Sequence, residues 1–311
     1  MLSLGLSIIL FTGCTAKNPE NNGKISVVAV SFAEYDFARA VCGDAAEVSM
    51  IMKPGGEYHG YEPSFSDVKK IAASDVFLYN GGESDSWIRS LLKSGNFEDV
   101  MAISLIDSAK LLQKDSDGHT HSHSHDNHSD ECEDYREFDE HIWLDFDNAI
   151  SMVNTICNAV CEKDEKNSAV YKENAQLYCN QIEVLKSIAL DLKDNKEKDY
   201  IIVGDRFPYL YLTEYVGVKH FSAIRGCGHE TEANPSVIIE IIDKIREDSI
   251  EIIFCDKMSD PSIAQTITKE TTAKILTLNS CQTISKTDFS EGKTYINLME
   301  ENLRNLKEAL M

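Results

Sequence analysis

Short apolar segments alternate with amphipathic segments in two long stretches of the chain. The short apolar segments are typical of β-strands, and the segments between them carry apolar residues at helical spacing. This alternation predicts parallel sheets covered by helices in both stretches. The expected strands are residues 24–31, 46–52, 75–79, 100–104, 200–203, 218–222, 250–255 and 274–278, and the expected helices are one that ends at Cys42, 65–73, 86–94, one that begins at Pro208, 235–246, 261–272 and 295–310.

The middle of the chain follows a different pattern. Residues 119–203 contain neither glycine nor proline, the two residues that most often interrupt regular structure. Apolar residues recur here at alternating steps of four and three, which predicts a long amphipathic helix within 146–197. This helix could be a strut that packs on both halves of the protein or the seam of a coiled-coil dimer, and its length of about three heptads favours the strut. The stripe consists of Tyr171, Ala175, Tyr178, Ile182, Leu185, Ala189 and Leu192.

These patterns together predict the fold class. We expect two parallel-sheet α/β lobes, 24–145 and 198–311, joined by one long rigid helix at 146–197. Ligands of open α/β sheets bind beyond the carboxyl ends of the strands. The cleft between the two lobes is therefore the expected binding site.

The first residues contain an apolar run, 2–12, that is followed directly by Gly13 and Cys14. A transmembrane helix needs about 20 apolar residues, so this run has the length of a signal-peptide core instead. The order resembles a bacterial lipoprotein signal. The resemblance implies a signal at 1–14 that ends at an acylated Cys14, a tether at 15–23, and attachment of the protein to the outer side of the cell membrane. The alternative is an apolar N-terminus without a targeting role.

Composition and charge narrow the class of ligand. The chain has 311 residues, 42% of them apolar, which is enough to fill two cores. Its 52 acidic residues against 30 Lys and Arg give a formal net charge of −22. Such a surface repels polyphosphates and attracts cations, so nucleic acid is not an expected partner.

The chain contains nine cysteines. Setting aside Cys14 leaves an even number, which in an exported protein is compatible with disulfides. No CxxC motif occurs, so a structural zinc site made of thiolates is not expected. Cys157 and Cys161 have the spacing of one helix face, which favours filling of the core over a bridge.

A histidine-rich segment, 115–134, is the most prominent local feature. Its closely spaced imidazoles are separated by small polar residues and surrounded by carboxylates, so the segment cannot form a packed core. Neutral imidazole is a common ligand of Zn²⁺, Cu²⁺ and Ni²⁺, which indicates an accessory loop for metal capture. The alternative is a solvated polar loop with weak affinity for metals. The imidazoles belong to His119, His121, His123, His125 and His128.

Two further histidines have a more specific context. His59 lies in a Pro- and Gly-rich loop between an expected strand and an expected helix, and Ser64 is placed to cap that helix. His141 lies in the apolar-flanked segment where the chain re-enters the first lobe. A single histidine of this kind is usually structural. Two of them on loops of one lobe, in a chain with a histidine-rich segment, point to a metal site.

The two segments around these histidines, 54–64 and 139–144, resemble the histidine motifs of the zinc- and manganese-specific solute-binding proteins of bacterial ABC importers. The resemblance covers nearly the whole chain after Cys14, including 81–84. It implies two lobes bridged by a rigid helix with one metal ion between them. It also implies a monomeric receptor without enzymatic activity, which passes its ion to a permease served by a cytoplasmic ATPase. Two imidazoles favour Zn²⁺ as the transported ion, with Mn²⁺ as the alternative.

The same resemblance implies the ligands. His59 and His141 are the expected ligands from the first lobe, with Glu57 and Glu62 as candidates to orient His59. The expected ligands of the second lobe are His229, with Glu230 and Glu232 as alternatives, and one of Asp256 and Asp260.

Two further positions of the second lobe bear on that set. Arg206 is expected to form a buried ion pair with Asp205. Gln282 stands where one branch of the family has a histidine, so one possible ligand is lost.

Two other functions use the same residues. An extracellular adhesin that buffers metal would rely on the histidine-rich segment, and a zinc hydrolase would combine His59 and His141 with one carboxylate and a water. The chain has no HExxH motif, nucleophile elbow or phosphate-binding loop to support the hydrolase.

Overall fold

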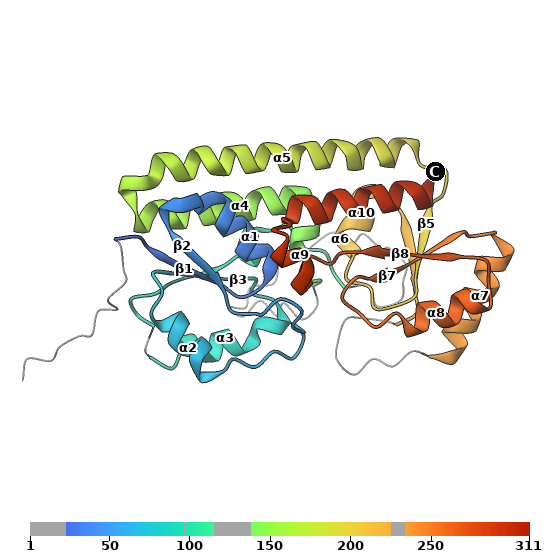
Figure 1. Cartoon of the computed structure of the whole chain (residues 1–311), viewed down its shortest axis with the longest axis horizontal. Helices are drawn as coiled ribbons and strands as arrows, with labels where there is room; N and C mark the ends of the chain where they lie inside the picture. The colour runs from blue at the N-terminus through green and yellow to red at the C-terminus, as the bar shows by residue number, and fades with distance from the viewer. Residues whose placement is uncertain (1–22, 96, 115–137, 225–233) are drawn as a thin grey trace, which may run out of the picture.

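The computed structural model describes residues 23–95, 97–114, 138–224 and 234–311, which form two four-stranded parallel sheets (Figure 1). The strand order is β2-β1-β3-β4 in the first sheet and β6-β5-β7-β8 in the second, so the two lobes share one topology. The predicted α/β fold and all eight predicted strands are confirmed. The strands are β1 (Ser26–Ala29), β2 (Glu47–Met50), β3 (Val76–Tyr79), β4 (Met101–Ser104), β5 (Tyr200–Val203), β6 (Lys219–Ser222), β7 (Ile252–Asp256) and β8 (Lys274–Leu278).

Helices flank both sheets, and some of them begin at residues whose side chains cap them. Ser64 caps α2 through the backbone N–H of Asp67, and Asn234 caps α7 immediately before Pro235. None of the helices described is long and apolar enough to cross a membrane. They are α1 (Phe32–Cys42), α2 (Phe65–Ala72), α3 (Ser86–Leu92), α4 (Phe146–Lys163), α5 (Ser168–Asn195), α6 (Leu210–Val216), α7 (Pro235–Glu247), α8 (Ser262–Lys269), α9 (Lys286–Ser290) and α10 (Tyr295–Leu310), with short 3-10 turns at η1 (Gly43–Ala45), η2 (Glu83–Asp85), η3 (Ile106–Ser108), η5 (Ile142–Leu144) and η6 (Glu165–Asn167).

The two faces of each sheet belong to different cores, because successive strand residues point to opposite sides. In the first sheet Val28 and Phe77 pack with α2 and α3, whereas Val27 belongs to the opposite face. The second sheet divides in the same way, with Ile202 and Ile253 packed against α7 and α8. The remaining faces of both sheets join α1, α4, α5, α6 and α10 in one continuous core that extends through both lobes.

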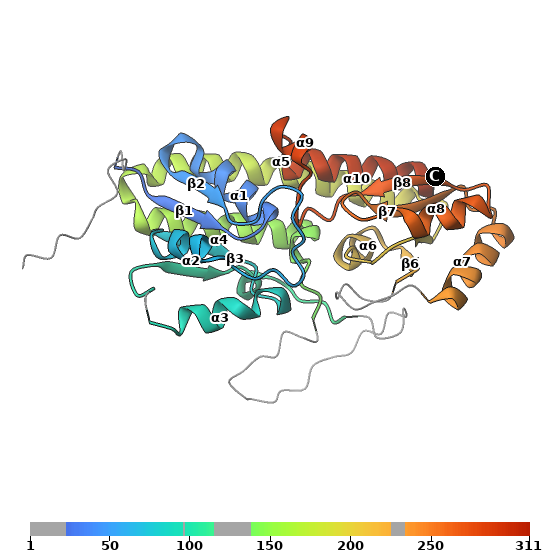
Figure 2. The same ribbon diagram turned by 60° about the horizontal axis from the view of Figure 1, so that its bottom comes forward.

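The apolar stripe of α5 lies in this shared core. Every residue of the predicted stripe is buried, from Tyr171 to Leu192. The helix packs on α1 and α4 in the first lobe and on α6 and α10 in the second, and both views show it running along both sheets (Figures 1 and 2). The strut is therefore confirmed, and the stripe is not available as a dimer seam.

The prediction of a single helix over 146–197 is wrong. This range contains α4, the turn η6 and the 28-residue α5, which form an antiparallel pair. The chain reverses at Asp164, whose carboxylate accepts hydrogen bonds from Asn167 and from the Tyr171 hydroxyl. An Asp side chain can end a helix in this way without glycine or proline. The absence of glycine and proline therefore did not show that the helix continues through 146–197.

The segment after β8 returns to the first lobe and forms backbone hydrogen bonds with it. The carbonyl of Gln282 accepts from the N–H of Phe32, and the carbonyl of Ile284 accepts from that of Gly55. The Trp143 indole donates to the carbonyl of Ser280 at 2.7 Å. The two lobes are therefore connected by directional bonds as well as by the shared core.

Asp36 of α1 provides the most buried of these connections. Its carboxylate accepts from the Tyr178 hydroxyl of α5 at 2.6 Å and from the N–H of Tyr295, the first residue of α10, at 2.8 Å. The third partner is the Arg39 guanidinium at 2.7 Å.

We expect Asp36→Asn to lower the free energy of unfolding by about 3 kcal/mol, because hydrogen bonds to a buried charged group are each worth about 1.5–3 kcal/mol. Urea unfolding followed by circular dichroism measures this loss. The control is Lys186→Gln, which breaks an exposed ion pair with Asp147 and should cost at most about 1 kcal/mol. Equal losses in the two variants would contradict a special role for Asp36.

Candidate metal centre

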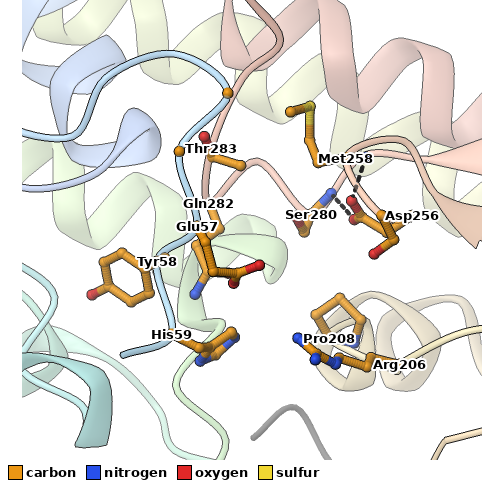
Figure 3. Close-up of a pocket in the computed structure, with 13 residues that line it drawn as sticks. Glu57, Tyr58, His59, Arg206, Pro208, Asp256, Met258, Ser280, Gln282 and Thr283 are labelled. Atoms are coloured by element: carbon orange, nitrogen blue, oxygen red, sulfur yellow. Dashed lines mark hydrogen bonds between the residues drawn. The ribbon is translucent and has the colours of Figure 1, made fainter. Parts of the chain in front are cut away.

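A pocket lies between the two lobes, at the carboxyl ends of β2, β5, β7 and β8 (Figure 3). One wall is the loop that follows β2, and the opposite wall comes from the segments after three strands of the second sheet. This is the position predicted for a ligand site in paired α/β lobes. The lining residues are Gly55, Gly56, Glu57, Tyr58, His59, Arg206, Pro208, Asp256, Met258, Ser259, Ser280, Gln282 and Thr283.

His59 lines the pocket, and contacts with Ser84 and Glu140 fix its imidazole ring. Its Nδ1 lies 3.0 Å from the Ser84 hydroxyl and 3.4 Å from the Glu140 carboxylate, and the Ser84 hydroxyl donates to that same carboxylate. These contacts orient the ring and leave Nε2 as the nitrogen available to a ligand.

His141 lies beside His59, with 5.9 Å between the ring centroids. Its Nδ1 and its backbone N–H both bond Asp139 at 2.9 Å, which fixes the ring at the start of η5. The side chain is buried, and within the described part of the chain its Nε2 has no hydrogen-bond partner. A buried nitrogen without a partner is costly in a folded protein unless it serves a ligand. The two imidazoles therefore fit a metal ion that both rings could reach.

The environments of the two rings shift their pKa values in opposite directions. Burial, together with the nearby His141, lowers the pKa of His59 below its usual value. Burial also lowers the pKa of His141, but the charge and the hydrogen bond of Asp139 outweigh it and raise that pKa overall. Both rings must be neutral at Nε2 to bind a metal, so a bound cation competes with a proton at His141 in particular.

Asp256 is the carboxylate that the second lobe brings to the pocket. Its oxygens accept from the Tyr209 hydroxyl at 2.6 Å. They also accept from the N–H of Met258 at 2.7 Å and from the N–H of Ser280 at 3.1 Å (Figure 3). Burial raises the pKa of this carboxyl above its usual value. Its charge contributes to raising the pKa of His141, which lies beside His59 but is not among the residues that line the pocket.

Asp205 and Arg206 do not form the predicted ion pair. The carboxylate of Asp205 accepts instead from the backbone N–H groups of Arg206 and Asp256, so it shapes the loop after β5. The side chain of Arg206 points toward His59 across the pocket (Figure 3).

Gln282 lines the pocket. In the sequence, this position was notable only because one branch of the family has a histidine there. The side chain of Gln282 is buried, and its Nε2 has no hydrogen-bond partner in the residues that the structure describes. The oxygen and nitrogen of an amide can be exchanged by a flip, so either can face the pocket. Cys281 adopts φ 56, and this left-handed residue separates two consecutive pocket positions, Ser280 and Gln282.

The structure places three predicted site residues at exposed positions. Glu57 and Glu62 are exposed, and Ser84 and Glu140 contact His59 in their place. Asp260 is exposed and accepts from the N–H of Ser262, at the beginning of α8. The signal for Ser84 and Glu140 was the proximity of their motifs to the two histidines, but only the folded loops bring them together.

The remaining predicted ligands lie outside the described residues. This applies to His229, Glu230 and Glu232, to the histidine-rich segment 115–134 and to Cys14. Within the described residues, no group of three or more His, Cys, Asp or Glu side chains is arranged to hold a metal ion.

Two buried carboxyl groups lie behind the His59 loop. Glu34 and Asp85 are almost completely buried, and among the described residues each has one oxygen without a hydrogen-bond partner and neither forms an ion pair. Burial and the neighbouring Asp85 raise the pKa of Glu34 to about 8, and burial raises the pKa of Asp85 to about 7. Two carboxylates without a cation cannot both be ionised at low cost in such a site, so the pair retains a proton near neutral pH.

Comparisons with known proteins agree with this arrangement. A family model described as "Zinc-uptake complex component A periplasmic" matches residues 27–309. Zinc-binding lipoprotein AdcA of Streptococcus pneumoniae is 28% identical over 301 residues, which are 96% of this chain and 58% of AdcA. The chain therefore spans little more than half the length of AdcA. The high-affinity zinc uptake system protein ZnuA of Bacillus subtilis is 27% identical over 93% of this chain and 88% of ZnuA.

A solved structure shows the same fold. The laminin-binding protein Lmb of Streptococcus agalactiae, described as bifunctional with adhesin and metal transporting activity, has a TM-score of 0.77 at 24% identity. The match covers 93% of this chain and all of that protein.

We expect Glu34→Gln to change how stability depends on pH. The pKa of Glu34 is raised to about 8 in the folded protein, whereas the same carboxyl group in an unfolded chain has its ordinary pKa of 4.5. Its contribution to stability is therefore complete below that value and is lost as pH rises toward 8. The variant should lack this loss and gain a few kcal/mol relative to the parent between pH 5 and pH 8, since each tenfold change in proton affinity corresponds to about 1.4 kcal/mol.

Urea unfolding at several pH values measures this difference. The exposed Glu300→Gln on α10 is the matched control and should follow the parent at every pH. A constant difference between Glu34→Gln and the parent would mean that Glu34 is ionised in the folded protein.

Proposed function

The chain belongs to the family of zinc-uptake complex component A proteins, and on this premise we propose that it is the extracytoplasmic receptor of an ABC-type zinc importer. It takes Zn²⁺ from solution into the pocket between its lobes and passes the ion to a membrane permease, whose ATPase lies on the cytoplasmic side. Acylation at Cys14 would keep the receptor beside that permease.

The pair of oriented imidazoles is the observation that carries this proposal. His59 and His141 each have Nδ1 fixed by neighbouring oxygen atoms, and the buried Nε2 of His141 has no hydrogen-bond partner among the described residues. Carboxylate contacts to Nδ1 are the usual second shell of a metal-binding histidine, since they fix the tautomer and make Nε2 more basic.

The second lobe completes the site in our proposal through Asp256 and Gln282. Asp256 and Gln282 are buried and line the pocket, and the side-chain nitrogen of Gln282 has no hydrogen-bond partner among the described residues. His229 and Glu232 remain further candidates from outside the described residues. A set of two imidazoles, one carboxylate and one amide oxygen suits the tetrahedral preference of zinc better than the all-oxygen octahedral preference of manganese.

Neither alternative function has comparable support. The family and the relatives are zinc-binding proteins, and no motif for hydrolysis accompanies the histidines. The likeness to Lmb is one of fold at 24% identity, so it does not extend adhesion to this chain. We assign the histidine-rich segment an accessory role in capturing metal.

We expect the chain without residues 117–134 to bind one tight equivalent of Zn²⁺ and to bind Mn²⁺ less tightly. His59→Ala or His141→Ala should each weaken zinc binding by about 100-fold or more, because each removes one direct ligand from a four-ligand site. Affinity should also fall as pH drops through the histidine range, since protons compete for the imidazoles. Titration against a competing chelator measures all three effects.

His220→Ala is the matched control for this titration. His220 is stacked on Phe207 with 3.5 Å between ring centroids, and it does not line the pocket. It should retain the affinity of the parent. Loss of tight binding on deletion of 117–134 alone would assign the metal to that segment and overturn the receptor proposal.

Gln282→Ala tests the second lobe separately. If the amide oxygen binds the ion, its removal should weaken zinc binding by about 10- to 100-fold without changing the fold, whereas Gln282→His should retain or strengthen binding. Thr283→Ala, which alters the next residue of the same wall, should have little effect. Unchanged affinity in Gln282→Ala would exclude this residue as a ligand.

A further inference from the structure

Four cysteine side chains gather where α1, α4 and α5 meet. Cys42 is the last residue of α1, Cys157 and Cys161 lie in the second half of α4, and Cys179 lies on α5. Their thiols are free, and those of Cys42 and Cys157 influence one another electrostatically. Cys157 lies eleven residues along α4 from Phe146, roughly 16 Å at the rise of an α-helix, so the cluster is separate from the pocket between the lobes.

The distance between two of these thiols suits a shared ion better than a disulfide. The Sγ atoms of Cys157 and Cys161 are 4.0 Å apart. A disulfide requires about 2.05 Å, which two residues one turn apart on a helix cannot reach without distortion. Two thiolates on one tetrahedral ion, each about 2.3 Å from it, are about 3.8 Å apart.

The surroundings of the pair allow an ion to enter. Cys161 is partly exposed, whereas Cys157 is 5% exposed. The backbone carbonyl of Ser168 lies 3.7 Å from the Sγ of Cys161 and adds an oxygen atom at the open side. The described residues supply only these two thiols to one ion, so solvent would occupy the remaining positions.

We propose that Cys157 and Cys161 form a second metal site that chelates one thiophilic d¹⁰ cation, independently of the pocket between the lobes. The spacing of the two sulfur atoms and the open side at Cys161 carry this assignment.

The reaction that fills the site exchanges protons for the ion. Two S–H bonds break, two metal–sulfur bonds form, and two protons leave to solvent for each divalent ion bound. Burial raises the pKa of Cys157 to about 12, and the ammonium group of Lys172 on α5 opposes this effect only partly. Binding should therefore weaken by about 100-fold for each unit by which pH falls, because two protons compete with one ion.

Cadmium is the probe for this site, because thiolate ligands give bound Cd²⁺ an ultraviolet charge-transfer absorption that imidazole and carboxylate ligands do not. The experiment uses the reduced full chain carrying Cys14→Ser, Cys132→Ser and Cys227→Ser, so that only cysteines of known position remain. We expect one equivalent of Cd²⁺ to produce the thiolate band. Cys157→Ser and Cys161→Ser should each abolish most of it.

Two controls separate this site from others. Cys255→Ser removes a buried thiol on β7 of the second lobe, and His59→Ala impairs the pocket between the lobes; both should retain the full band. Retained tight zinc binding by the Cys157 and Cys161 variants shows that they still fold.

Three results would overturn the proposal. They are no thiolate band in the parent, a band of unchanged size in Cys157→Ser, and a pH dependence that corresponds to one proton instead of two. Failure of the zinc receptor would appear separately, as loss of tight zinc binding with the cadmium band intact.

Discussion

The buried contacts that join the two lobes determine the geometry on which the metal pocket depends. Asp36 holds helices α5 and α10 against α1, and the segment after β8 forms hydrogen bonds with the loop that carries His59. One apolar core also runs through both lobes beneath α5. A large rotation between the lobes would break several of these bonds together, each costly when left unsatisfied in the interior. In the proposed receptor, capture of the ion would therefore depend on local movement of side chains and loops around a nearly fixed frame.

This frame also explains how distant parts of the sequence meet. His59 follows β2, His141 precedes α4, and Asp256 and Gln282 follow strands of the second lobe. Each lies beyond the carboxyl end of a parallel strand or in a segment that crosses there, which is where α/β folds place their ligands. Trp143 reinforces the junction, because its indole donates to Ser280 while its carbonyl accepts from the Tyr295 hydroxyl. Along the chain, residues that hold the two lobes together thus alternate with residues that form the site between them.

Periodicity predicted the strands and most helices because burial of one face imposes a regular spacing on the sequence. It failed at Asp164, where a side-chain hydrogen bond reverses the chain without glycine or proline. His59 and His141 were identifiable because each lies in a distinctive local motif. Ser84, Glu140 and Gln282 were not, since their roles depend on contacts between segments that are far apart in the sequence. Glu57 and Glu62 were candidates because they are carboxylates close to His59 in the sequence, but the carboxylate that reaches Nδ1 of His59 belongs to Glu140.

The proposed ligand set accounts for how a receptor could bind zinc tightly and still release it. Two imidazoles and one amide are neutral, so Asp256 would be the only charged direct ligand of a doubly charged ion. Further negative charge comes from Asp139 and Glu140, which lie behind the imidazoles and do not bind the ion themselves. Charge held at this distance stabilises the bound cation without adding bonds that must be broken on release. The negative charge of Asp139 and Glu140 also raises the pKa of His141. At lower pH a proton would therefore compete with the ion for this imidazole and favour release of the ion.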